Sequence, residues 1–256
     1  MNLEDQDHRP VENAAAIDGG AGRVEMLPNS VLLDALAEFA AGLGHEINNP
    51  LAIISGHAQI LLQEAEGADE RRHLAVILAQ VKRSYEMIAD VRLFSRPPQP
   101  QITVFRARQW LASSLDVWEE DHVSPAVSLV RLPFDGEEES FASDPAMLGT
   151  ILGALLKNAS EALVSQRGVI QVSGRCREGY LLFSVEDDGP GIAEETRPHI
   201  FSPYFSGRPA GRGLGFGLPK AYALTRALGG TITLEDTPGC RVVVRVPNAA
   251  SKEGIV

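Results

Sequence analysis

A histidine, a carboxylate and an amide lie within one possible helical turn near residue 45. Residues 44–50 read Gly-His-Glu-Ile-Asn-Asn-Pro, so Glu46 directly follows His45 and Asn49 comes four residues after it. Side chains four apart on a helix share a face, so His45 and Asn49 would stand side by side. Imidazole is a nucleophile near neutral pH, a carboxylate can act as a base, and an amide can position water or phosphate. The segment therefore combines a nucleophile with two groups that could assist it.

The helix that must carry this segment is marked by an apolar stripe. Its residues recur at alternating spacings of three and four, and they are Leu33, Leu36, Ala40, Leu43, Ile47, Leu51, Ile54, Ala58 and Leu61. His45 and Asn49 fall between stripe positions, so we expect both to face solvent. Asn29 and Ser30 are good residues to start the helix, and Pro50 predicts a bend beside His45. A lone helical histidine is usually a plain surface residue, but a costly proline inside a strong helical pattern favours a function.

A second helix follows a polar break at residues 66–69 and keeps the same apolar alternation as far as Val91. It ends before Arg96-Pro97-Pro98-Gln99-Pro100, which predicts a stiff, extended connector. The short break implies an antiparallel helical hairpin. One hairpin cannot bury both apolar stripes, so we expect a homodimer in which two hairpins form a four-helix bundle.

Composition excludes several classes of protein. The 256 residues leave room for about two modest domains. No apolar run approaches the roughly 20 residues of a membrane span, and the N-terminus is unlike a signal peptide, so we expect a cytoplasmic protein. A net charge of −11 argues against nucleic acid as a direct partner. Cys176 and Cys240 lack metal-binding spacing and should pack as small apolar residues.

The second half of the chain carries three pieces that could together hold a nucleotide. The first is a helix from about Asp144 to Leu163, which the Asp144-Pro145 pair should start. Asn158 lies on the apolar stripe of this helix. An amide on a covered face needs partners, so Asn158 is either a satisfied core asparagine or an oxygen ligand for Mg²⁺.

The second piece ends a predicted β-hairpin formed by residues 169–177 and 180–186. The second strand leads into Asp187-Asp188-Gly189-Pro190-Gly191-Ile192. Asp187 could accept the amine of adenine, and Gly189 and Gly191 would let the backbone approach a flat base. The alternative is an ordinary Asp-Gly turn.

The third piece is a glycine-rich segment at residues 211–218, ahead of a helix that reaches Leu228. Alternating glycines before a helix can cradle phosphates with backbone N–H groups, and Arg208 adds positive charge. The candidate residues in the segment are Gly211, Gly213, Gly215, Gly217 and Leu218. The alternative is a flexible loop, and the pattern is neither a Rossmann turn nor a P-loop.

Taken in this order, the pieces closely resemble the two-component sensor histidine kinases over about residues 31–247. The similar motifs are the H box at 44–51, the N box at 155–163, the G1 box at 187–192, the F box at 201–206 and the G2 box at 211–218. The H box is most similar to the nitrogen-regulation branch, whose pattern is His-Glu-Ile-x-Asn-Pro-Leu.

The resemblance implies an α+β fold. An antiparallel helical hairpin would form a dimeric four-helix bundle, and an α/β sandwich ATP-binding domain of the Bergerat type would follow it. We expect residues 1–28 to be a disordered lead-in, 29–98 the dimerisation and phosphotransfer hairpin, 101–248 the catalytic domain, and 249–256 a flexible tail.

The resemblance also implies a chemistry for the singled-out residues. His45 would attack the γ-phosphate of ATP, with Glu46 as base or as the group that orients the ring. Asn158 would hold Mg²⁺, Asp187 would read adenine, and the glycine-rich segment with its arginine would surround the phosphates. The partner would be the receiver domain of a response regulator, and Asn49 would position water to dephosphorylate it.

The chain departs from the family pattern at three positions. Ala154 stands where a second asparagine is usual, Arg208 where a lysine is usual, and Leu214 where a threonine is usual. The family also carries an upstream sensor, so input would come from a separate sensor protein. Two alternatives stay open, a protein that works mainly as a regulator phosphatase and a non-catalytic dimeric scaffold with a nucleotide-binding domain. A gyrase-type or mismatch-repair-type ATPase fits less well, because it lacks the hairpin with His45.

Overall fold

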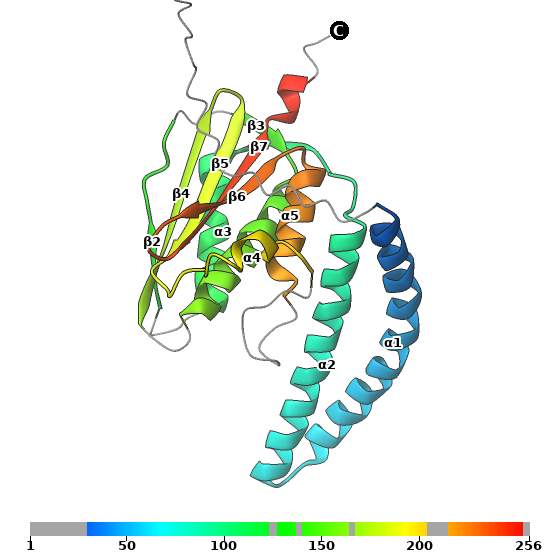
Figure 1. The fold of residues 1–256 in the computed structure, drawn as a ribbon. Coiled ribbons are helices and arrows are strands. Elements are labelled where there is room, and N and C mark those ends of the chain that lie inside the picture. The colour runs from blue at the N-terminus through cyan, green and yellow to red at the C-terminus, as the bar shows by residue number, and fades with distance from the viewer. Residues whose placement is uncertain (1–29, 123–126, 137–139, 164–166, 204–214, 253–256) are drawn as a thin grey trace, which may run out of the picture.

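The computed structural model comprises a helical hairpin followed by an α/β domain (Figure 1). It describes residues 30–122, 127–136, 140–163, 167–203 and 215–252. Within the first helix, side chains are described for Gly44 and for residues 46–64. In the part of the chain that is described, no helix has the length and apolar character needed to cross a membrane.

The hairpin consists of two long helices, α1 (Ser30–Glu64) and α2 (Ala68–Ser95), which lie side by side (Figure 1). Ala58, Ala65 and Leu74 are buried between them near the turn, where Arg71 Nε donates to the carbonyl of Ala65 at 2.9 Å. The predicted antiparallel hairpin is thus confirmed. Helix α1 continues through Pro50 and is curved in Figure 1, as the missing N–H of that residue predicts.

The second domain is built on a five-stranded mixed sheet. The strands are β2 (Val127–Arg131), β4 (Gly168–Arg177), β5 (Tyr180–Asp187), β7 (Cys240–Pro247) and β6 (Thr231–Asp236), in that spatial order. Strand β2 runs parallel to β4, and the other neighbours are antiparallel. The predicted hairpin of β4 and β5 turns at Glu178-Gly179, whose positive φ angles of 54° and 74° suit a tight hairpin turn.

Three helices cover one face of this sheet, α3 (Ala107–Asp121), α4 (Pro145–Ala162) and α5 (Gly217–Ala227) (Figure 1). A short two-stranded sheet of β1 (Thr103–Arg106) and β3 (Ser140–Ser143) lies beside them. Alternate residues of the three central strands are buried under the helices, as a sheet with one covered face requires. These buried residues are Ile170, Val172, Leu181, Phe183, Val185, Val242, Val244 and Val246. The predicted α/β sandwich is confirmed.

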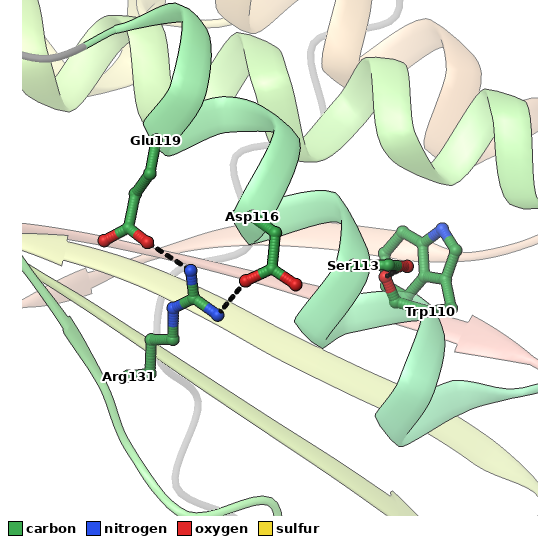
Figure 2. Close-up of polar contacts among 5 residues, drawn as sticks. All are labelled: Trp110, Ser113, Asp116, Glu119 and Arg131. Atoms are coloured by element: carbon green, nitrogen blue, oxygen red, sulfur yellow. Dashed lines mark hydrogen bonds and ion pairs between the residues drawn. The ribbon is translucent and has the colours of Figure 1, made fainter.

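Helix α3 is fixed to the edge strand by a charged clamp (Figure 2). Arg131 on β2 donates to Asp116 at 2.5 Å and also to Glu119, one turn further along α3. The hydrogen bond to Asp116, together with the two negative charges, raises the pKa of the Arg131 guanidinium. On the other side of α3, Trp110 Nε1 donates to the carbonyl of Pro145 at 3.1 Å. The helix is therefore tied to both β2 and the start of α4.

The C-terminal end differs in part from the expected flexible tail. Residues 249–252 form a short 3-10 helix, η2 (Ala249–Lys252). The side chain of Asn248 explains this turn, because its Oδ1 accepts from Ala142 N at 3.0 Å and from Ala250 N at 3.1 Å. The predicted lead-in at 1–28 and the rest of the predicted tail lie outside the described residues.

The start of α4 depends on one buried carboxylate, and this makes a stability prediction. Asp144 Oδ1 accepts from Ala146 N and Met147 N, and Oδ2 accepts from Gln101 N at 2.7 Å. The Asp144→Ala variant removes this cap, so we expect the free energy of unfolding to fall by about 2 kcal/mol. Urea unfolding followed by tryptophan fluorescence measures this, since both tryptophans lie on α3.

The matched control is Glu120→Ala, because Glu120 is exposed on α3. It should change the free energy of unfolding by no more than about 0.5 kcal/mol. Equal stability of Asp144→Ala and the wild-type protein would show that the cap does not hold α4.

Candidate functional site

Asn158 is positioned by the buried face of α4. Leu148, Ile151 and Leu155 on this helix are at most 2 % exposed and pack into the core of the domain. Asn158 follows Leu155 by one turn and is half-buried. Its amide is therefore held at the border between the core and the surface, where an oxygen could reach a ligand.

Asp187 is the last residue of β5 and is only 3 % exposed. Its Oδ1 accepts from Gly189 N at 3.0 Å, which curls the following loop back over the carboxylate. A Cβ on Gly189 would lie 2.6 Å from that same oxygen, so only glycine fits this turn. Gly191 has a positive φ of 73°, a second position that favours glycine. The loop thus presents close-packed backbone beside a buried carboxylate.

The start of α5 provides the third part of the site. Gly215 has a positive φ of 68°, and the helix begins at Gly217 with Leu218 buried behind it. The first N–H groups of a helix have no partner within the helix and favour an anion. The predicted Arg208, Gly211 and Gly213 lie outside the described residues.

Helix α4 brings these three parts together. A Cβ on Gly217 would lie 3.9 Å from the carbonyl of Ala154, one turn before Asn158. A Cβ on Gly189 would lie 3.5 Å from the Cβ of Ala162, one turn after Asn158. Asn158 therefore lies between the loop that follows β5 and the start of α5. The arrangement suits a flat base at the loop, phosphates at the helix start, and a cation near the amide.

The predicted reactive segment lies in the other part of the molecule, on α1. Glu46 and Asn49 are both exposed, as predicted for Asn49, whereas the side chain of His45 lies outside the described ones. Tyr85 on α2 donates its hydroxyl to the carbonyl of Asn48 at 3.2 Å. A cavity of about 930 Å³ lies next to this contact, and its lining includes Gly44, Asn48, Tyr85, Ile88, Arg92 and Leu93. The cavity belongs to the hairpin and is distinct from the site around Asn158.

Two residues that the sequence did not single out support the loop after Asp187. Arg197 Nε donates to the carbonyl of Ile192 at 3.2 Å, and its Nη2 donates to Asp236 at 2.7 Å. This hydrogen bond and the positive charge of Arg197 lower the pKa of Asp236. Gly239 lies so close to the loop that a Cβ there would be 1.8 Å from the carbonyl of Asp187. No local pattern could reveal either contact, because Pro238-Gly239 looks like any turn.

Cys240 lies opposite Asp187 in the register of β5 and β7. Burial, reinforced by the negative charge of Asp187, raises the pKa of the Cys240 thiol to about 12. The thiol is therefore neutral at physiological pH and is a poor nucleophile. Its burial in the core confirms the expectation that it packs as a small apolar residue, whereas Cys176 is half-buried.

Family models match both parts of the molecule. Residues 35–100 match HisKA, the His Kinase A phospho-acceptor domain, and residues 143–250 match HATPase_c, the histidine kinase-, DNA gyrase B- and HSP90-like ATPase. The chain belongs to the sensor histidine kinase family. The HisKA match contains the segment with His45, and the HATPase_c match contains Asn158, Asp187 and the start of α5.

Individual relatives agree with the family models. Sensor histidine kinase ZraS of Klebsiella oxytoca is 33% identical over 211 residues, which are 81% of this chain and 44% of ZraS. The chain thus spans less than half the length of this curated relative.

Solved structures match the same fold. Full-length ShkA in complex with AMPPNP has a TM-score of 0.71 at 21% identity, over 82% of this chain and 45% of that one. ThkA in complex with the response regulator protein TrrA has a TM-score of 0.63 at 23% identity, over 87% of this chain and 64% of that one. At these identities, the likeness supports the fold alone.

Proposed function

We propose that this protein is an ATP-dependent protein-histidine kinase that phosphorylates itself on His45. The observation that carries the proposal is the convergence around α4, where Asn158 lies between the Asp187 loop and the start of α5. A phospho-acceptor hairpin in the same chain gives this site a nucleophile to serve. The scaffold alternative gives no reason for a buried carboxylate and a helix start to face the same amide.

The described residues fit a nucleotide and its cation. Asp187 is buried at a loop too tight for side chains at Gly189, which suits an adenine amine against the carboxylate. The N–H groups at the start of α5 would meet the phosphates, together with the glycine-rich segment and Arg208. Asn158 would hold Mg²⁺, which neutralises phosphate charge when bound.

The transfer itself needs little from the protein beyond positioning. A ring nitrogen of His45 would form a bond to the γ-phosphorus while the bond from that phosphorus to the β–γ bridging oxygen breaks and ADP leaves. Glu46 would take the ring proton or orient the ring. A neutral imidazole is nucleophilic near pH 7 without a strong base. The phosphate would then move from the histidine nitrogen to a carboxylate oxygen of a response regulator.

The exposed position of Asn49 supports a second activity at the same segment. Its amide lies one turn after His45 and is open to a docked partner. It would position a water molecule that hydrolyses the aspartyl phosphate of the regulator. The pattern His-Glu-Ile-x-Asn-Pro-Leu leads us to assign the chain to the nitrogen-regulation branch, and the upstream sensor expected from the resemblance stays a prediction.

We further propose that the hairpin is a homodimer. The single hairpin leaves large apolar side chains exposed along both helices, and Ile53 is 62 % exposed. The others are Ile47, Ile54, Ile60, Leu61, Val76 and Ile77. Two hairpins that pack as a four-helix bundle would cover these faces. Light scattering should give twice the mass of one chain, and a monomer at micromolar concentration would contradict this.

The kinase proposal predicts where label from γ-labelled ATP appears. With Mg²⁺, the wild-type protein should take up label that is lost in acid and kept in base, as expected for a phosphorus–nitrogen bond. The His45→Gln variant should take up none, because the nucleophile is gone. Gel autoradiography after acid or base treatment measures both properties.

His57→Gln is the matched control, since His57 is another exposed histidine of α1. It should label at the wild-type rate. Asp187→Asn should lose both label and ATP binding in calorimetry. Undiminished label on His45→Gln would overturn the assignment of the nucleophile.

The phosphatase activity predicts a separate effect of Asn49. We expect Asn49→Ala to slow the loss of phosphate from the cognate regulator at least about tenfold while autophosphorylation stays near the wild-type rate. The measurement is release of phosphate from a purified, phosphorylated receiver domain. Gln59→Ala, which changes another exposed amide of α1, serves as control. Equal dephosphorylation by Asn49→Ala and wild type would remove this role from Asn49.

A further inference from the structure

The hairpin and the nucleotide domain meet where the start of α5 lies on the C-terminal part of α2 (Figure 1). Lys220 Nζ donates to Asp90 Oδ1 at 2.5 Å. Beside this ion pair, the rings of Phe94 and Phe216 meet edge to face, with centroids 6.2 Å apart. One contact is charged and the other aromatic, and together they join the two parts of the molecule.

These two contacts form one continuous strip. Asp90 and Phe94 are four residues apart on α2, and Phe216 and Lys220 are four apart along the start of α5, so each pair shares a helix face. Both phenylalanines are buried, and the side chains of Lys220 and Asp90 are only 16 % and 26 % exposed. Partial burial screens the ion pair less than a surface pair. The strip is therefore strong enough to hold the domain in place.

The strip lies on the face of α2 that is turned away from α1. Tyr85 and Ile88 contact α1 beside the histidine segment, at Asn48 and Gly44. Asp90 follows Ile88 by two residues, a rotation of about 200° around the helix. Figure 1 accordingly shows α2 between α1 and the nucleotide domain. In this arrangement the width of α2 separates the phosphate-binding end of α5 from the helix that carries His45.

We propose that the Asp90–Lys220 ion pair is a latch that holds the nucleotide domain in a resting position on α2. It pins the first turn of α5, which directly follows the glycine-rich segment. The latch must open before the domain can carry the γ-phosphate to His45. Asp90 thus acts through Lys220 as a positioning residue, and this role rests on the proposed kinase function.

The test compares Asp90→Asn, Lys220→Gln and the charge-swapped pair Asp90→Lys with Lys220→Asp in the full chain. Hydrogen exchange without nucleotide reads the docking, and the initial rate of labelling at saturating ATP reads the transfer. Each single variant should exchange faster in peptides that cover residues 88–96 and 216–224 and should label about fivefold faster. The swapped pair should restore both values. Glu86→Gln, an exposed carboxylate of α2, should match the wild type in both.

Asp90→Asn is the decisive single variant because it leaves the nucleotide domain unchanged, so ATP affinity in calorimetry should stay the same. Unchanged exchange and unchanged labelling in this variant would overturn the latch. Slower labelling that the swapped pair restores would also overturn it, because the ion pair would then hold the productive arrangement. A wild-type protein that takes no label would refute the kinase function, while hydrogen exchange would still decide whether the ion pair docks the domain.

Discussion

The packing of α4 against the sheet is the interaction on which the candidate site depends. Its apolar face is fully buried, and Asp144 fixes its first turn. Because the same rigid helix reaches the start of α5 on one side of Asn158 and the Asp187 loop on the other, it sets their mutual distance. A close-packed interior transmits any shift of this helix directly to the site. The geometry for binding a nucleotide therefore follows from ordinary core packing.

Elements with a strong local pattern could be predicted from the sequence. The alternation of three and four along α1 and α2, the cap before α4 and the Glu178-Gly179 turn each involve residues close together in the chain. Local side-chain periodicity and turn chemistry determine such elements directly. For the same reason, the exposure of Asn49 and the burial of Cys240 followed from their place in these patterns.

The contacts that complete the site could not be predicted, because they join residues far apart in the sequence. Lys220 and Asp90 are separated by 130 positions, and no periodicity links them. Gly239 approaches the carbonyl of Asp187 only because β7 pairs with β5 in one register. The strand order, with β7 between β5 and β6, also depends on tertiary packing. These features appear only when the sheet is assembled.

The account assigns binding to a rigid site around α4 and transfer to a histidine on a separate hairpin, so its central claim concerns where the phosphate ends. Mass spectrometry of peptides prepared at neutral pH after incubation with ATP and Mg²⁺ tests this directly, since fragmentation distinguishes His45 from His57 and His73. The account predicts one phosphate per chain, on His45. Phosphate on another residue, with none on His45, would contradict it.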